Sequence, residues 1–275
     1  MTKNKIKTLL TSVLVLTAMV GTSDYASNSA YASLILPSST ASQISAAGYE
    51  PSEIGFYKAA KDGNIKVLSL FTEANIFVNM KDSTRKTPVY VAAAAGQAKA
   101  VRFFLLCGAD INARDENMTS PLMAAINAKS YETAQVLIDA NANIKVADDN
   151  GYTPLHYAVF NNQIGITQLI ATHWCDIDAT DNEGNTPLFY AAAKDMAILQ
   201  TLLNAGADKN GLNGKNRTAL HNAVLKNNIT NVRLLLDNGV NVNIEDIYGH
   251  TPIYYAQKGS QIYNMLLESG ARVSD

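Results

Sequence analysis

The sequence predicts an all-α solenoid of about seven stacked helix pairs that are joined by β-turns. A six-residue motif, in which Thr or Ser is mostly followed by Pro, then by apolar residues and Ala, starts at Thr87, Ser120, Thr153, Thr186, Thr218 and Thr251. Successive starts lie 33, 33, 33, 32 and 33 residues apart. Five residues before each start lies Asp82, Asp115, Asp148, Asp181, Asn213 or Asp246. A fixed period of this length is typical of arrays in which each unit buries its apolar face against its neighbours.

Each copy of the motif is expected to open the first helix of a unit. The hydroxyl can cap free N–H groups, and proline loses no hydrogen bond at the first helical position. The second helix should end where Gly or Asn recurs, because these residues tolerate the left-handed conformation of a helix C-cap. These positions are Asn75, Gly108, Asn141, Gly206, Gly239 and Gly270. Trp174 interrupts the series, so the second helix of the fourth unit should end by another route.

The remaining apolar runs place the second helices and the core. Second helices are expected at 101–106, 133–138, 166–170, 197–203 and 232–236, and Leu155 should lie on the buried face of the fourth unit. The fifth unit is one residue shorter than its neighbours, which predicts a tighter turn between its helices. The last helix, over 261–269, has one polar stripe, which suits an end of the array that faces water.

The period together with the segment Thr153-Pro154-Leu155-His156-Tyr157-Ala158 resembles the ankyrin repeat, a β-turn plus two antiparallel helices stacked into a curved solenoid. The resemblance covers residues 52–275. It divides the expected ankyrin-repeat domain, 53–275, into units at about 53–81, 82–114, 115–147, 148–180, 181–212, 213–245 and 246–275. The first unit lacks the Thr-Pro start and is expected to be an N-terminal cap.

The N-terminal segment predicts export. Three lysines precede a mainly apolar stretch over 9–20, and Ala30-Tyr31-Ala32 offers a small-residue cleavage site, so residues 1–32 are interpreted as a bacterial signal peptide. The alternative is an uncleaved anchor. Residues 33–52, rich in Ser and Ala, are expected to be a flexible linker. The mature protein would be periplasmic or secreted, without membrane insertion.

Composition and motifs argue against several function classes. The formal net charge is -2, and no dense Lys/Arg run follows the first seven residues, which argues against nucleic acid as the partner. His156 and His221 occupy a repeated motif position where other units have Tyr, Met or Phe, so we expect them to be structural. No nucleophile with a neighbouring base, no metal-ligand spacing and no phosphate loop is found, so neither catalysis nor a cofactor is expected.

The resemblance implies a module that binds a protein partner, of unknown identity, through its turn tips and the concave face of its first helices. On the matching positions, the expected contact residues are Tyr152 and Phe160 first, then Arg217 and Tyr248, with Asn127, Asn161 and Lys194 on the first helices. Interfaces draw most of their energy from a few buried aromatic and Arg side chains, which favours this order. We expect a monomer. Two alternatives stay open: an accessory protein for a resident periplasmic enzyme, and an enzyme with an unrecognised site.

Overall fold

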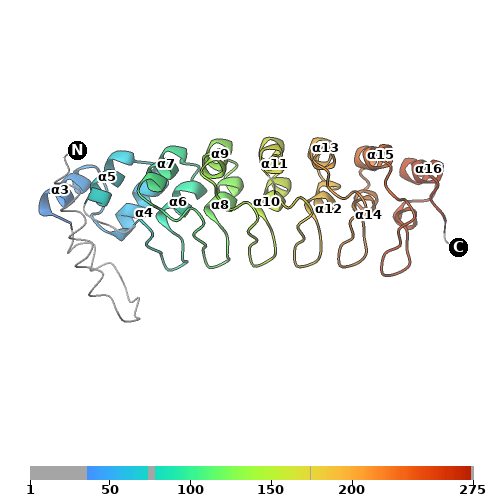
Figure 1. Ribbon diagram of the computed structural model, residues 1–275, viewed down its shortest axis with the longest axis horizontal. Helices are drawn as coiled ribbons and strands as arrows, with labels where there is room; N and C mark the ends of the chain where they lie inside the picture. Colours follow the sequence, from blue (N-terminus) through green and yellow to red (C-terminus); the bar gives the residue numbers. More distant parts are fainter. Residues whose placement is uncertain (1–35, 74–77, 174, 274–275) are drawn as a thin grey trace.

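A computed structural model describes residues 36–73, 78–173 and 175–273. It is an elongated array in which the second helices form one row, the first helices form another beside it, and the turns project on the far side of the first helices (Figure 1). The pairs are α4 (Glu53–Asp62) with α5 (Ile65–Glu73), α6 (Pro88–Ala94) with α7 (Ala98–Leu106), α8 (Pro121–Asn127) with α9 (Tyr131–Asp139), α10 (Pro154–Phe160) with α11 (Ile164–Ala171), α12 (Pro187–Ala191) with α13 (Met196–Asn204), α14 (Ala219–Leu225) with α15 (Ile229–Asp237), and the 3-10 turn η1 (Pro252–Tyr255) with α16 (Gln261–Glu268). The predicted all-helical solenoid is confirmed.

Each unit packs on the next through both rows of helices, so the core runs along the whole array. Leu155 is only 1% exposed, as its motif position predicts. Four motif hydroxyls, those of Thr87, Ser120, Thr186 and Thr218, cap their helices as expected. Thr186 Oγ1, for example, accepts a hydrogen bond from the backbone N of Phe189 at 3.2 Å, which satisfies one free N–H at the start of α12. A central unit therefore shares its buried face with neighbours on both sides.

The expected left-handed residues follow the second helices. Gly108, Asn141, Gly206, Gly239 and Gly270 have φ of 82, 63, 88, 67 and 87°. Asn75 and Trp174 lie outside the described residues. In the fourth unit, α11 ends at Ala171, and the backbone N of the next residue, Thr172, bonds the carbonyls of Gln168 and Ile170.

The expected flexible linker is wrong where the structure describes it. Residues Ser38–Ala46 form a helix, α3, that packs on α5 at the N-terminal end of the array (Figure 1). Ile44 is fully buried and Leu36 is 8% exposed. Two apolar anchors are too few to give a visible period, yet burying them on α5 stabilises a segment whose alanines favour a helix.

Two units depart from the common pattern, and both departures follow from their shortened sequences. In the second, third, fourth and sixth units, the ninth residue after the motif start has positive φ. These residues are Gly96, Lys129, Asn162 and Asn227. The fifth unit lacks such a residue, and α12 has only five residues before the chain turns. The predicted tight turn is thus present. In the last unit the first helix is reduced to η1, and Thr251 Oγ1, which should cap it, has no partner.

The predicted signal peptide, residues 1–32, lies outside the described residues. In the part of the chain that is described, no helix combines the length and the hydropathy needed to cross a bilayer.

Candidate partner-binding surface

Six five-residue turns, which we call fingers, share one construction. In the finger 148–152, Asp148 Oδ1 accepts hydrogen bonds from the backbone N of Asn150 at 2.9 Å and of Tyr152 at 2.8 Å. The same pair of bonds forms at Asp82, Asp115, Asp181, Asn213 and Asp246. The fourth residue of each finger has positive φ, from 55 to 82°. The repeated Asp or Asn therefore caps its own turn, as its position predicts.

The fingers are also bonded to one another through their backbones. The N–H of Asp149 donates to the carbonyl of Asn117 at 3.2 Å, and the N–H of Asn182 donates to the carbonyl of Asn150 at 3.0 Å. Equivalent bonds join the other neighbouring fingers from 82–86 to 246–250. The tips therefore form one row with fixed spacing, and their side chains present a preorganised surface.

The two motif histidines hold successive units together. In His156, Nδ1 accepts from the backbone N of Thr153 at 3.2 Å, and Nε2–H donates to the carbonyl of Asn185 in the next finger at 3.2 Å. His221 repeats both bonds with Thr218 and His250. Burial lowers the pKa of both imidazoles, which favours the neutral form that these bonds require. Both histidines have the structural role that the sequence predicted.

Tyr152 and Phe160, the first predicted contact residues, meet at the middle of the array. Their ring centroids lie 4.9 Å apart at an interplanar angle of 89°. The ring of Tyr190, from the next unit, lies 4.7 Å from that of Phe160 and 6.4 Å from that of Tyr152. We call Tyr152, Phe160 and Tyr190 the aromatic cluster. All three are half-buried, so the rings support one another and still present apolar surface to solvent.

Tyr190 was not among the predicted contact residues, because its contact with Tyr152 and Phe160 forms between two units and not within one. Its hydroxyl donates to Asp181 Oδ2, which fixes the ring against the finger 181–185. Burial and the bond to Asp181 both raise the pKa of Tyr190, so the hydroxyl stays protonated. Phe160 thus packs on the following unit through Tyr190, and the exposed part of its ring belongs to the same surface.

The predicted residues Asn127, Asn161 and Lys194 border the cluster. Asn161 Nδ2 donates to Asn127 Oδ1 at 3.0 Å, and Lys194 Nζ donates to the carbonyl of Phe160 at 3.2 Å. These bonds link neighbouring units, and Asn127 remains exposed. The structure therefore places these three side chains together at the ends of the first helices.

Arg217 is occupied within the protein. Its Nε donates to Asp246 Oδ2 at 3.0 Å, another guanidinium nitrogen donates to the hydroxyl of Tyr255 at 2.8 Å, and its side chain is 19% exposed. Burial alone would raise the pKa of Asp246, but bonds from Tyr255, two backbone amides and Arg217 outweigh it and lower the pKa well below the usual range. These contacts give Arg217 a structural function that the sequence did not indicate.

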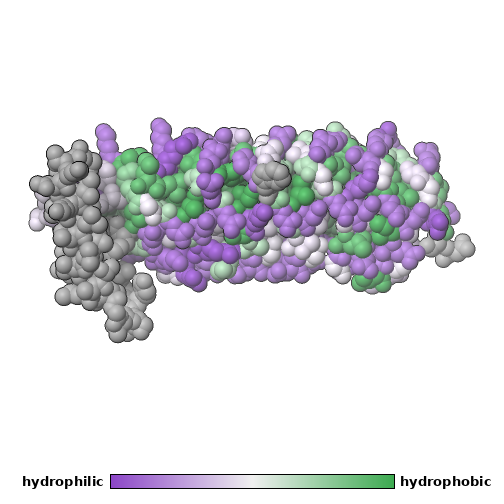
Figure 2. All heavy atoms as spheres, in the orientation of Figure 1, coloured by the Kyte–Doolittle hydropathy of each residue, from purple (hydrophilic) through white to green (hydrophobic). Residues whose placement is uncertain are grey.

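Tyr248 lies apart from the aromatic cluster, at the C-terminal end of the row of fingers. It is 62% exposed, and Ile247 and Tyr254 beside it are 53% and 58% exposed. Figure 2 shows mostly hydrophilic residues along the fingers and a hydrophobic spot at the C-terminal end of that row. Leu225, 42% exposed at the motif position of Phe160, is a further apolar residue that the sequence reasoning missed.

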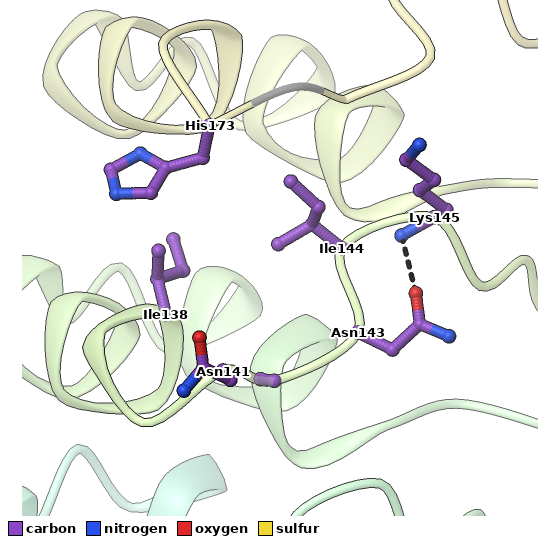
Figure 3. A pocket seen from close by; sticks show the side chains of 7 residues that line it. Ile138, Asn141, Asn143, Ile144, Lys145 and His173 are labelled. Atoms are coloured by element: carbon purple, nitrogen blue, oxygen red, sulfur yellow. Dashed lines mark hydrogen bonds between the residues drawn. The ribbon is translucent and has the colours of Figure 1, made fainter.

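A shallow cavity of about 230 Å³ lies on another part of the array, between the ends of α9 and α11 (Figure 3). Ile138, Ile144, Lys145 and His173 line it. In other units the residue at the position of Lys145 is an Asn or Asp whose side chain accepts a backbone N–H from the next unit. Asn112, for example, accepts from the backbone N of Asn143 at 2.8 Å. Lys145 has no acceptor atom and cannot form this bond. The cavity lies at this junction between units, and it is smaller than the roughly 300–1,000 Å³ of typical ligand sites.

Within residues 36–73, 78–173 and 175–273, no three His, Cys, Asp or Glu side chains lie together in a way that could hold a metal ion. Cys107 is exposed and Cys175 is half-buried, both as free thiols. Burial raises the pKa of each thiol, which disfavours the nucleophilic thiolate.

Comparisons with known proteins agree with the geometry. The family model "Ankyrin repeats (3 copies)" matches residues 40–115, 99–181, 122–213 and 191–275. The chain belongs to the ankyrin-repeat family. Among solved structures, the ankyrin repeat domain of human ASB11 matches with a TM-score of 0.71 at 22% identity, and the match covers 80% of this chain and 99% of the ASB11 chain. The ankyrin repeat domain of Bcl-3 has a TM-score of 0.70 at 25% identity, covering 78% and 97%.

Curated relatives match this ankyrin-repeat protein over short stretches. The E3 ubiquitin-protein ligase KEG of Arabidopsis thaliana is 40% identical over 77 residues, which is 27% of this chain and 5% of the ligase. The potassium channel AKT3 of rice is 41% identical over 66 residues, 24% of this chain and 7% of the channel. An ankyrin repeat protein of fowlpox virus is 48% identical over 48 residues, 18% of this chain and 34% of the viral protein. Each match therefore spans well under two thirds of the relative's own length.

Proposed function

We propose that this protein binds a protein partner through the turn–helix surface, formed by the fingers and the adjoining first helices, with the aromatic cluster at its centre. Ankyrin-repeat arrays are generally protein–protein interaction modules. The observation that carries the proposal is the half-buried cluster of Tyr152, Phe160 and Tyr190 on fingers and helices that are locked together by backbone bonds. Rigid, partly exposed rings at the centre of a surface are typical interface anchors, because their side chains are already ordered before binding and little conformational entropy is lost.

The test is capture of partners by the double variant Tyr152→Ala with Phe160→Ala, beside wild type and a matched control. The control is Tyr131→Ala with Leu106→Ala, since these side chains are 47% and 89% exposed and lie on second helices. We expect wild type and control to retain the same partner. Calorimetry should then show the cluster variant binding at least about thirtyfold more weakly, which corresponds to about 2 kcal/mol.

Circular dichroism of each variant separates lost binding from lost fold. If the cluster variant keeps wild-type helicity and wild-type affinity, the turn–helix surface is not the binding site.

A further inference from the structure

The charge around the aromatic cluster restricts the chemistry of its partner, and this inference rests on the proposed function. The three middle fingers, 115–119, 148–152 and 181–185, contain six carboxylates and no Lys, Arg or His. These are Asp115, Glu116, Asp148, Asp149, Asp181 and Glu183. The fingers on either side contain cations: Arg85 and Lys86 in one, Lys215 and Arg217 in the other. Negative charge is therefore concentrated on the finger that carries Tyr152 and on its two neighbouring fingers.

Two cations border these fingers, but they bond backbone carbonyls and not the carboxylates: Arg114 donates to the carbonyls of Met118 and Ala147, and Lys194 donates to that of Phe160. Glu116, Asp149 and Glu183 are exposed at the finger tips. Among the residues that the structure describes, the one ion pair with N and O within 4.0 Å is that between Arg217 and Asp246, so none involves the middle fingers. At the roughly 10 Å spacing of packed helices, three neighbouring fingers present this charge along about 20 Å.

The last unit shows how the repeated geometry holds a guanidinium. Tyr255 donates its hydroxyl to Asp246 Oδ2 at 2.6 Å, and Arg217 from the preceding finger bonds both groups. The guanidinium carbon lies 4.9 Å from the centroid of the Tyr255 ring. A carboxylate and a tyrosine ring thus bind one arginine by an ion pair and a cation–π contact together.

The fourth unit repeats this pair without an arginine. Tyr157 donates its hydroxyl to Asp148 Oδ2 at 2.7 Å, as Tyr255 does to Asp246. The residue that corresponds to Arg217 is Thr119, whose hydroxyl instead bonds Tyr90 at 2.9 Å. Asp148 keeps 9% of its surface exposed, and Tyr157 is half-buried beside Tyr152, with ring centroids 6.4 Å apart.

We propose that the turn–helix surface takes an arginine-rich segment of its partner. One partner guanidinium lies against Asp148 and Tyr157 beside the aromatic cluster, as Arg217 lies against Asp246 and Tyr255. Further cations face the tip carboxylates Glu116, Asp149 and Glu183. Complementary charge of this kind speeds encounter and rejects acidic segments. Arginine is favoured over lysine, because its planar fork can meet a carboxylate and a ring at once.

The probe is a fluorescein-labelled peptide of about ten residues, long enough to span the middle fingers at about 3.3 Å per residue. It carries arginines at alternate positions, and counterpart peptides carry Lys or Glu instead. The tip variant is Glu116→Gln, Asp149→Asn, Glu183→Gln. Its matched control, Glu132→Gln, Asp139→Asn, Asp237→Asn, makes the same change of net charge at exposed residues of the second helices.

By fluorescence anisotropy at low salt, the arginine peptide should bind wild type at least tenfold more tightly than the glutamate peptide, and more tightly than the lysine peptide. The tip variant should lose at least tenfold in affinity for it, and the control less than twofold. Raising the salt should weaken binding to wild type more than to the tip variant. Equal losses in tip variant and control, or no measurable binding of the arginine peptide, would overturn the inference.

The outcome is separable from that of the proposed function. If a captured partner is lost by the Tyr152 and Phe160 variant but binds the tip variant as it binds wild type, the proposed function stands and the charge inference fails.

Discussion

Replacing Arg217 by methionine should destabilise the protein through the loss of a contact between the sixth and seventh units. Methionine keeps an apolar stem of similar length but removes every donor. Asp246, whose side chain is fully buried, would lose its cation and keep its bonds from Tyr248 N at 2.9 Å, His250 N at 3.2 Å and Tyr255 Oη at 2.6 Å.

The magnitude follows from what remains. Breaking a buried ion pair by removing one partner costs about 3–5 kcal/mol, because a charge is left uncompensated. Three remaining hydrogen bonds compensate part of that charge, while the cation–π contact of Arg217 with Tyr255, about 0.5–1 kcal/mol at a partly exposed site, is also lost. We therefore expect a loss of about 2–3 kcal/mol in the free energy of unfolding at pH 7.

Urea denaturation at pH 7 measures this loss, with Lys215→Met as the matched control. Lys215 is exposed in the same finger, and its substitution should change stability by less than about 0.5 kcal/mol. Because Arg217 bonds Asp246 and Tyr255 of the seventh unit, amide hydrogen exchange should show α16 opening first in Arg217→Met.

The pH dependence gives an independent check. The pKa of Asp246 is lowered on folding, so its stabilisation is full above the unfolded pKa of about 4 and is lost as pH falls through the folded pKa. The difference in stability between wild type and Arg217→Met should therefore be largest at neutral pH and shrink below about pH 4. The reasoning is refuted if Arg217→Met matches Lys215→Met at pH 7, and Arg217 is then free to contact a partner.

Three further outcomes are expected. Leu155→Ala should lower the free energy of unfolding by about 2–5 kcal/mol in urea denaturation, whereas the 89% exposed Leu106→Ala should stay near wild type, and equal stabilities would contradict the assigned core. Because burial lowers the pKa of His156 and His221, the unfolded state binds protons more readily, so stability should fall as pH drops below about 6.5, by at most about 1.4 kcal/mol per pH unit for each histidine. Thermal melts of a His156→Met, His221→Met variant should show a flatter pH dependence, and an unchanged slope would argue against neutral buried imidazoles. For export, which we propose from the N-terminal segment, N-terminal sequencing of protein recovered outside the cytoplasm should show cleavage after Ala32, and an intact Met1 would contradict cleavage.

The candidate surface was predictable where it repeats and was not where two units meet. The motif register alone placed Tyr152 and Phe160 on the finger and first helix of one unit. It did not reveal that Tyr190 completes their cluster, because that contact depends on how far one unit is displaced and turned relative to the next. The same displacement brings Arg217 to Asp246, 29 residues along the chain, and gives a predicted binding residue a structural role that the sequence did not indicate.

The sequence by itself determined the helix pairs, their number and their core face. The helices and their core face are encoded within a single unit, by Thr-Pro starts, Gly or Asn ends and the apolar positions between them, and the count of repeats gives the number of pairs. Only the tertiary structure showed the helix α3 at the N-terminal end of the array and the side-chain contacts between neighbouring units. Ile44 makes α3 a helix because α5 offers a surface to bury it, and no local pattern in a Ser- and Ala-rich segment records that surface. Contacts between units depend on shape and stacking over distances of about 30 residues, which a sequence period cannot encode.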